Sequence, residues 1–108
     1  MSQRTNLSTS KNGKYKIKLH PAVIQEDSKL LDAKQKEKIK AKCIALLSSN
    51  PNDVGQPLRF ELTGYRKLKI FNDYRVVYRV DDFEVTVFII AVGIRRDEIV
   101  YESAKSRL

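Results

Sequence analysis

Residues 85–92 are apolar at every position except Thr86, a pattern that fits a strand buried on both faces. Such a strand lies in the interior of a sheet that other elements cover on both sides. Two further strand patterns precede it, at residues 67–70 and 74–80, and turn-forming residues separate all three segments. The C-terminal half therefore predicts a three-stranded antiparallel meander in which residues 85–92 lie centrally.

The N-terminal half predicts one strand and two helices. Residues 15–20 alternate apolar side chains with lysines, which is the period-two pattern of a half-buried strand. A short helix is expected from Pro21, and a longer helix is expected after Asp32, where a glutamine three residues on completes a capping-box pattern. This helix ends near Ser48, and the prolines and glycines of residues 51–64 indicate an irregular connection.

The chain has 108 residues and a mass of 12.5 kDa, which suffices for one domain. An α+β fold is predicted, with one strand, two helices, the meander and a C-terminal element. For that element, at residues 97–108, the sequence leaves open a helix or a strand followed by a helix. Residues 1–14 are polar and are expected to form a flexible tail, so the folded domain is placed at residues 15–108.

The single cysteine and the single histidine argue against a disulfide framework and a zinc module. Cys43 lies on the apolar stripe of its helix and is expected to be a buried free thiol. His20 is expected to end a strand or cap a helix rather than to act in catalysis. Neither a secretion signal nor a run of about 18 apolar residues is seen. A cytoplasmic protein with no metal, no cofactor and no membrane partner is therefore predicted.

The charge points to a polyanionic partner. Lys and Arg number 21 against 13 Asp and Glu, a net charge of +8, and nucleic acid is the leading candidate. In the predicted meander, Lys67 and Lys69 share one face of their strand, and Arg75 and Arg95 can converge on them with Tyr101 at the edge. Arginine makes bidentate hydrogen bonds to phosphate oxygens, lysine supplies a point charge and tyrosine stacks on bases. This combination predicts a phosphate-binding site.

Three segments carry a family resemblance. Residues 65–70 read YRKLKI, residues 73–80 read DYRVVYRV and residues 93–101 read GIRRDEIVY. Together with the order of the predicted elements, they resemble toxins of the RelE/ParE superfamily over about residues 15–105. The resemblance implies a toxin of a bacterial toxin–antitoxin pair that cleaves mRNA in the ribosomal A-site. Its partners would be a cognate antitoxin, the ribosome and mRNA.

The resemblance also implies a set of site residues. The catalytic positions of RelE-like toxins match Lys67, Lys69, Arg75, Arg95 and Tyr101. Neighbouring arginines are expected to contact RNA, namely Arg66, Arg79 and Arg96. Because Arg95 and Arg96 are adjacent, the sequence does not decide which of them takes the family's arginine role.

The implied reaction is attack of a ribose 2′-OH on the adjacent phosphodiester, which leaves a 2′,3′-cyclic phosphate and a free 5′-OH. No suitable histidine is available for proton transfer. A lysine among like charges has a lowered pKa, so either Lys67 or Lys69 is expected to act as the base. Arg75 and Arg95 are expected to stabilise the developing charge, because arginine stays protonated.

Two other functions fit the same composition. One is a ParE-like inhibitor of DNA gyrase, which needs no catalytic residues. The other is a nucleic-acid-binding domain without catalysis. The joint presence of Lys67, Lys69, Arg95 and Tyr101 favours the nuclease, because a pure inhibitor has no need for a converging phosphate site.

Overall fold

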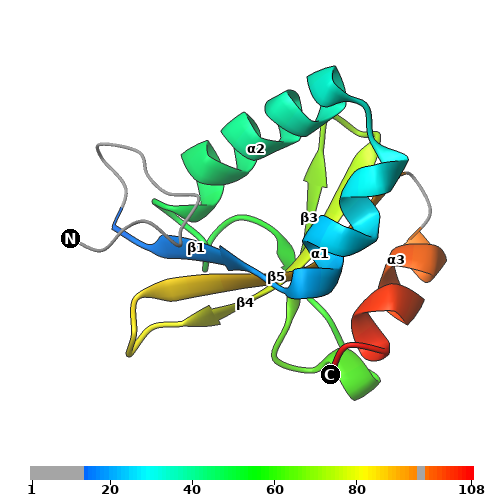
Figure 1. Cartoon of the computed structure of the whole chain (residues 1–108). Helices are drawn as coiled ribbons and strands as arrows, with labels where there is room; N and C mark the ends of the chain where they lie inside the picture. The colour runs from blue at the N-terminus through cyan, green and yellow to red at the C-terminus, as the bar shows by residue number, and fades with distance from the viewer. Residues whose placement is uncertain (1–13, 95–96) are drawn as a thin grey trace.

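The computed structural model describes residues 14–94 and 97–108 and contains a five-stranded sheet with helices on both faces (Figure 1). The strand order is β1-β5-β4-β3-β2. The strands are β1 (Lys16–Leu19), β2 (Gln56–Pro57), β3 (Arg66–Ile70), β4 (Tyr74–Asp81) and β5 (Thr86–Ile94). The antiparallel meander of β3, β4 and β5 confirms the prediction, and β5 is an interior strand as expected, although β4 is the middle one.

The helical segments also follow the sequence closely. They are α1 (Pro21–Gln25), η1 (Asp27–Leu30), α2 (Ala33–Leu47), η2 (Phe60–Leu62) and α3 (Asp97–Lys105). The His20 side chain accepts a hydrogen bond from the Ala22 N–H and so caps α1. The capping box of α2 forms between Asp32 and Gln35, as predicted. The C-terminal element, which the sequence left open, is the helix α3.

Two features were not predicted. The connection at residues 51–64 holds the short strand β2, which extends the sheet beside β3, and the single turn η2. The first strand, β1, pairs with β5 in parallel, with Ile17 opposite Val87, and both side chains are fully buried. Of the predicted flexible tail, residues 1–13 lie outside the described residues. Lys14 is described, and its backbone N–H donates to the Ser48 carbonyl.

The sheet separates two apolar clusters. The larger one lies on the face covered by α1 and α2, here called the α2 face, and includes Ile17, Ile39, Cys43, Leu47, Val76 and Tyr78. The smaller one lies on the opposite face, here called the α3 face, and consists of Leu62, Val77, Ile90, Ala91, Val100 and Ala104. Cys43 is 3% exposed, so the expectation of a buried thiol is confirmed.

The helix α3 lies close against β5 because Gly93 has no side chain. A Cβ at this position would collide with Cγ2 of Val100, a buried residue of α3. The first turn of α3 is thereby held near the ends of β3 and β4, where the predicted site residues lie.

Candidate anion site

Lys67 and Lys69 extend from the α3 face of β3. Leu68 and Ile70 alternate with them and are buried in the larger cluster on the other face, so the pleat of the strand fixes the direction of both lysines. Arg75 is paired with Lys69 across the β3–β4 ladder and therefore lies on the same face. The predicted convergence of these three cations is confirmed.

A carboxylate from α3 joins two of these cations. Lys67 Nζ donates to Oδ2 of Asp97 at 3.0 Å, and Arg75 Nε donates to Oδ1 of the same carboxylate at 2.7 Å. The side chains of Lys67 and Arg75 are 15% and 13% exposed, whereas that of Asp97 is 40% exposed. Two largely buried donors thus hold one oxyanion at the solvent boundary. Arg75 is further fixed by hydrogen bonds from its Nη1 to the carbonyls of Asn72 and Tyr74.

Tyr101 completes the arrangement from the next turn of α3. It lies four residues after Asp97, so both side chains are on one face of the helix. Lys67 Nζ is 6.0 Å from the centre of the Tyr101 ring. Lys67, Arg75, Asp97 and Tyr101 are here called the anion site.

The titration of the site follows from these contacts. Partial burial lowers the pKa of Lys67, but the hydrogen bond to Asp97 and the nearby Tyr101 outweigh burial, and the net pKa is raised. Partial burial raises the pKa of Asp97, but the hydrogen bonds from Lys67 and Arg75 outweigh it and hold the pKa below its ordinary value. At neutral pH the site is therefore a charged triad.

The expectation of a lowered pKa is wrong for Lys67. The expectation considered only the neighbouring cations, which lower the pKa of a lysine. It left out Asp97, a residue that sequence reasoning did not assign to the site. A usable signal was present, because Asp97 and Glu98 open the C-terminal helix just after two arginines. Which of the two carboxylates faces Lys67 depends on how α3 packs on the sheet.

The other predicted site residues differ in position. Arg95 and Arg96 lie outside the described residues. Arg66 alternates with Lys67 and lies on the α2 face, where its Nη2 donates to the Gly55 carbonyl, so it is not part of the anion site. Arg79 also lies on the α3 face, two residues beyond Val77 on β4. Its guanidinium packs 4.4 Å from the Phe88 ring centre.

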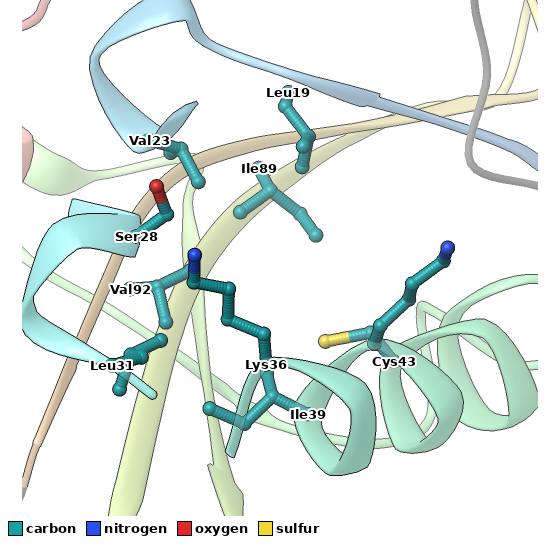
Figure 2. A pocket seen from close by; sticks show the side chains of 10 residues that line it. Leu19, Val23, Ser28, Leu31, Lys36, Ile39, Cys43, Ile89 and Val92 are labelled. Atoms are coloured by element: carbon teal, nitrogen blue, oxygen red, sulfur yellow. The ribbon is translucent and has the colours of Figure 1, made fainter. Parts of the chain in front are cut away.

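Three of the hollows formed by the described residues lie near the predicted site residues or the apolar core. A polar hollow of about 360 Å³ adjoins the anion site and is lined by Gly55, Gln56, Lys67, Leu68 and Lys69. A second, of about 260 Å³, lies between η2 and α3 and includes Tyr101. The third, of about 170 Å³, is on the opposite side, where Leu19, Val23, Ile39, Cys43, Ile89 and Val92 give it an apolar lining (Figure 2). This third hollow is remote from the predicted chemistry.

Residues 14–94 and 97–108 are the part of the chain that the structure describes. No group of three or more His, Cys, Asp or Glu side chains is arranged to hold a metal ion in this part of the chain. Within the same residues, no helix has the length and apolar character needed to cross a membrane.

Comparison with known proteins identifies the family. Residues 17–99 match the family described as the ParE toxin of type II toxin–antitoxin systems. The chain belongs to the RelE/ParE superfamily of type II toxins. Membership confirms the resemblance drawn from the segments around Lys67, Arg75 and Tyr101.

Individual relatives are RelE toxins. Toxin RelE of Mycobacterium tuberculosis is 41% identical over 63 residues, which cover 55% of this chain and 64% of the relative, slightly less than two thirds of its length. Among solved structures, a RelBE toxin–antitoxin complex from M. tuberculosis has a TM-score of 0.70 and 27% identity, with 82% of this chain and 98% of that chain covered. A double arginine variant of E. coli toxin RelE, in complex with a peptide of antitoxin RelB, has a TM-score of 0.63 and 30% identity over 84% of this chain and 94% of that chain. The superfamily toxin is thus of RelE type, and its α+β fold is that of the RelE structures.

Proposed function

We propose that this RelE-type toxin is an endoribonuclease that cleaves mRNA in the ribosomal A-site, in the cytoplasm. One observation carries the proposal: Lys67 and Arg75, on neighbouring strands, donate to the two oxygens of a single carboxylate. That carboxylate stands where an RNA phosphate would bind, because both are oxyanions that accept charge-assisted hydrogen bonds. The identity of the relatives, which are RelE toxins, supports the same function.

The proposed reaction is attack of a ribose 2′-OH on the adjacent phosphodiester, with release of the 5′-oxygen. Arg75 stabilises the extra negative charge of the phosphorane, because it is fixed in position and always protonated. Lys67, whose pKa is raised, stays protonated and donates to a phosphate or leaving-group oxygen. Lys69, which is exposed and lies opposite Arg75 on the neighbouring strand, is proposed to take the 2′-OH proton in its deprotonated form. Tyr101 stacks on or hydrogen-bonds the nucleotide.

The anion site must open before it can act. Asp97 occupies both donors in the free toxin, so an RNA phosphate has to replace the carboxylate and the first turn of α3 has to shift. Such exchange keeps an oxyanion next to the two largely buried cations, while the displaced Asp97 carboxylate, which is 40% exposed, loses its partners and is hydrated by water. Arg95, which lies outside the described residues, is proposed as a further phosphate contact, with Arg96 as the alternative, and Arg79 and Arg66 as RNA contacts outside the anion site.

A cognate antitoxin is proposed as the neutralising partner. Two solved relatives are complexes with an antitoxin or an antitoxin peptide. Such a partner is expected to cover the basic α3 face or to displace α3, and either would remove the anion site from RNA. A complex in which α3 keeps its position and the anion site is as accessible as in the free toxin would refute steric neutralisation.

The experiment measures single-turnover mRNA cleavage on programmed ribosomes, with the position of the cut read by toeprinting. Arg75→Ala is expected to slow cleavage by of order 10² or more, because a donor to the transition state is removed, while ribosome binding falls much less. Lys67→Ala is expected to act in the same direction. Lys38→Ala is the matched control, since it removes a lysine from the exposed face of α2.

The gyrase-inhibitor function makes the opposite prediction. The family that matches residues 17–99 is named for ParE, so the same experiment also tests for inhibition of gyrase. Intact mRNA together with gyrase-dependent DNA breaks would replace the nuclease by the inhibitor. Equal effects of Lys38→Ala and Arg75→Ala on the cleavage step would show that the α3 face is not the active face of the sheet.

A further inference from the structure

Apart from Tyr101, the residues that line a hollow beside the anion site have no role in the proposed reaction. This hollow has a volume of about 260 Å³ and lies between η2 and the α3 helix. In Figure 1, the green turn of η2 is seen next to the red end of α3. Leu58 and Leu62 give the hollow an apolar base, and Phe60 and Tyr101 supply two aromatic side chains. Tyr101 therefore borders both the hollow and Lys67 of the anion site.

Phe60 is held in an unusual conformation at the mouth of this hollow. Its side chain is 85% exposed, and its φ of 55° lies in the left-handed region that bulky residues rarely adopt. The neighbouring Leu62 is 4% exposed and anchors the turn in the smaller cluster. The Thr63 N–H and hydroxyl both donate to the Phe60 carbonyl. The turn is thus firmly fixed, and backbone strain of this kind is concentrated at functional sites.

The charges around the hollow differ from those of the anion site. Arg59 and Glu61 both line it and carry opposite charges, and Lys105 is paired with Glu102 at 3.0 Å. Lys67 and Arg75, in contrast, surround the single carboxylate of Asp97. The hollow is therefore unsuited to a phosphate and suited to a neutral, flat group that stacks on an aromatic ring.

We propose that this hollow binds a nucleobase of the RNA next to the scissile phosphate, with Phe60 as the stacking surface. The proposal rests on the proposed nuclease function. Every base has a π-face, so aromatic stacking is available to any sequence, while the Glu61 carboxylate and the Arg59 guanidinium offer hydrogen bonds that discriminate among base edges. Tyr101 lines the hollow and its ring centre lies 6.0 Å from Lys67 Nζ, so the hollow directly adjoins the anion site, as the position of a base next to the bound phosphate requires.

The test compares base dependence in the toxin and in Phe60→Gly. Glycine accepts a positive φ, so this variant removes the ring while relieving the backbone, and thermal unfolding is expected at an equal or higher temperature. Single-turnover cleavage is measured on ribosomes programmed with normal mRNA and with mRNA that carries an abasic nucleotide on the 5′ or the 3′ side of the cut.

For the unaltered toxin, an abasic nucleotide on one side is expected to weaken the apparent affinity by about 5- to 150-fold, the range of one base stacked on an aromatic side chain. Phe60→Gly is expected to show that loss already with normal mRNA and no further loss with the abasic one. Phe60→Tyr should restore the base dependence. Phe83→Gly is the matched control, because Phe83 is 96% exposed at the β4–β5 turn and lines no hollow described above.

The outcomes separate the two proposals. If the toxin cleaves mRNA but Phe60→Gly keeps the full penalty of an abasic nucleotide on both sides, the base subsite is refuted and the nuclease stands. An equal loss in Phe83→Gly would also overturn the subsite, because it would reflect exposed aromatic surface in general. If the unaltered toxin leaves mRNA intact, the nuclease itself is refuted, and the base subsite with it.

Discussion

Asp97 places a negative charge between the two cations of the anion site, Lys67 and Arg75. Its two oxygens take one hydrogen bond each from Lys67 and Arg75, which would otherwise repel each other within a few ångströms. The carboxylate thus stabilises the empty site and competes with an incoming phosphate. Asp97 therefore increases the stability of the folded protein and decreases its affinity for phosphate.

Asp97→Asn is expected to bind inorganic phosphate more tightly than the unaltered toxin. An amide carries no negative charge, so phosphate no longer displaces an ion pair, and the gain is roughly three- to tenfold because water screens the Asp97 carboxylate, which is 40% exposed. Chemical-shift titration with phosphate at constant ionic strength measures it. Glu98→Gln, an exposed neighbour on α3, is the control. Unchanged or weaker phosphate binding would mean that Asp97 serves chiefly to orient the cations.

The same triad predicts how stability depends on pH. The pKa of Asp97 is below its ordinary value of 3.8, so its contribution is present above that value and is lost as the pH falls through the folded-state pKa. The pKa of Lys67 is above 10.5, so its contribution is present below that value and is lost as the pH rises further. The difference in unfolding free energy between the toxin and Asp97→Asn should therefore be constant at neutral pH and shrink in acid. A difference that persists below the folded-state pKa of Asp97 would contradict this account.

At the scale of elements, α2 and α3 cover opposite faces of the sheet and differ in what holds them. The longer helix, α2, is fixed by its capping box and by apolar side chains on its inner face, Ile39, Cys43 and Leu47. The shorter helix, α3, depends on a close approach to β5 at Gly93. Each contact suggests a separate measurement.

Cys43 reports whether α2 stays closed. Burial raises the pKa of its thiol to about 12, so almost no thiolate exists at pH 8. A thiol-specific reagent such as dithionitrobenzoate is expected to leave the folded toxin unmodified over a time in which the unfolded chain reacts completely. Fast stoichiometric labelling of the folded toxin would show that α2 opens readily from the sheet.

Gly93→Ala tests the docking of α3. The new methyl group collides with Val100, so the helix has to move away from β5, at a cost of about 1–3 kcal/mol of unfolding free energy. Because Asp97 and Tyr101 are carried by the same helix, the anion site should be disturbed as well, with slower mRNA cleavage. Urea unfolding and cleavage are measured on one preparation. Unchanged values of both would show that α3 adjusts without cost.

At the scale of the whole molecule, the turn η1 and the C-terminal end of the chain meet at β5. Beyond Ile89 the edge of β5 has no partner in β1, and side chains take its place. The Val92 N–H donates to Asp27, and Arg107 Nη1 donates to the Ile90 carbonyl. Asp27 and Arg107 also pair with each other at 2.8 Å, with both side chains 7% exposed. This ion pair closes the sheet edge and fastens the C-terminus.

Arg107→Ala is expected to lower the unfolding free energy by about 3–5 kcal/mol, because Asp27 is left buried without its counter-charge. Equilibrium unfolding in urea measures the change. Lys105→Ala removes a cation of the exposed pair with Glu102 and should have little effect. A small effect of Arg107→Ala, equal to that of Lys105→Ala, would show that water reaches Asp27.

Local pattern alone determined much of this protein. The alternation around Leu68, the apolar run at residues 85–92 and the capping box at Asp32 each depend on residues close together in the chain, so they predicted the meander and α2 correctly. The same alternation fixed the face on which Lys67, Lys69 and Arg75 meet, because a strand turns every second side chain to the same side.

The tertiary structure alone decided the rest. The parallel pairing of β1 with β5 and the partners of Asp27 and Asp97 follow from strand register and helix docking. Asp97 is 30 residues from Lys67 in sequence, and Arg107 is 80 residues from Asp27. No local pattern encodes such a contact. A largely buried cation requires an anionic partner. Which carboxylate lies within reach of that cation is decided only when α3 and η1 pack on the sheet.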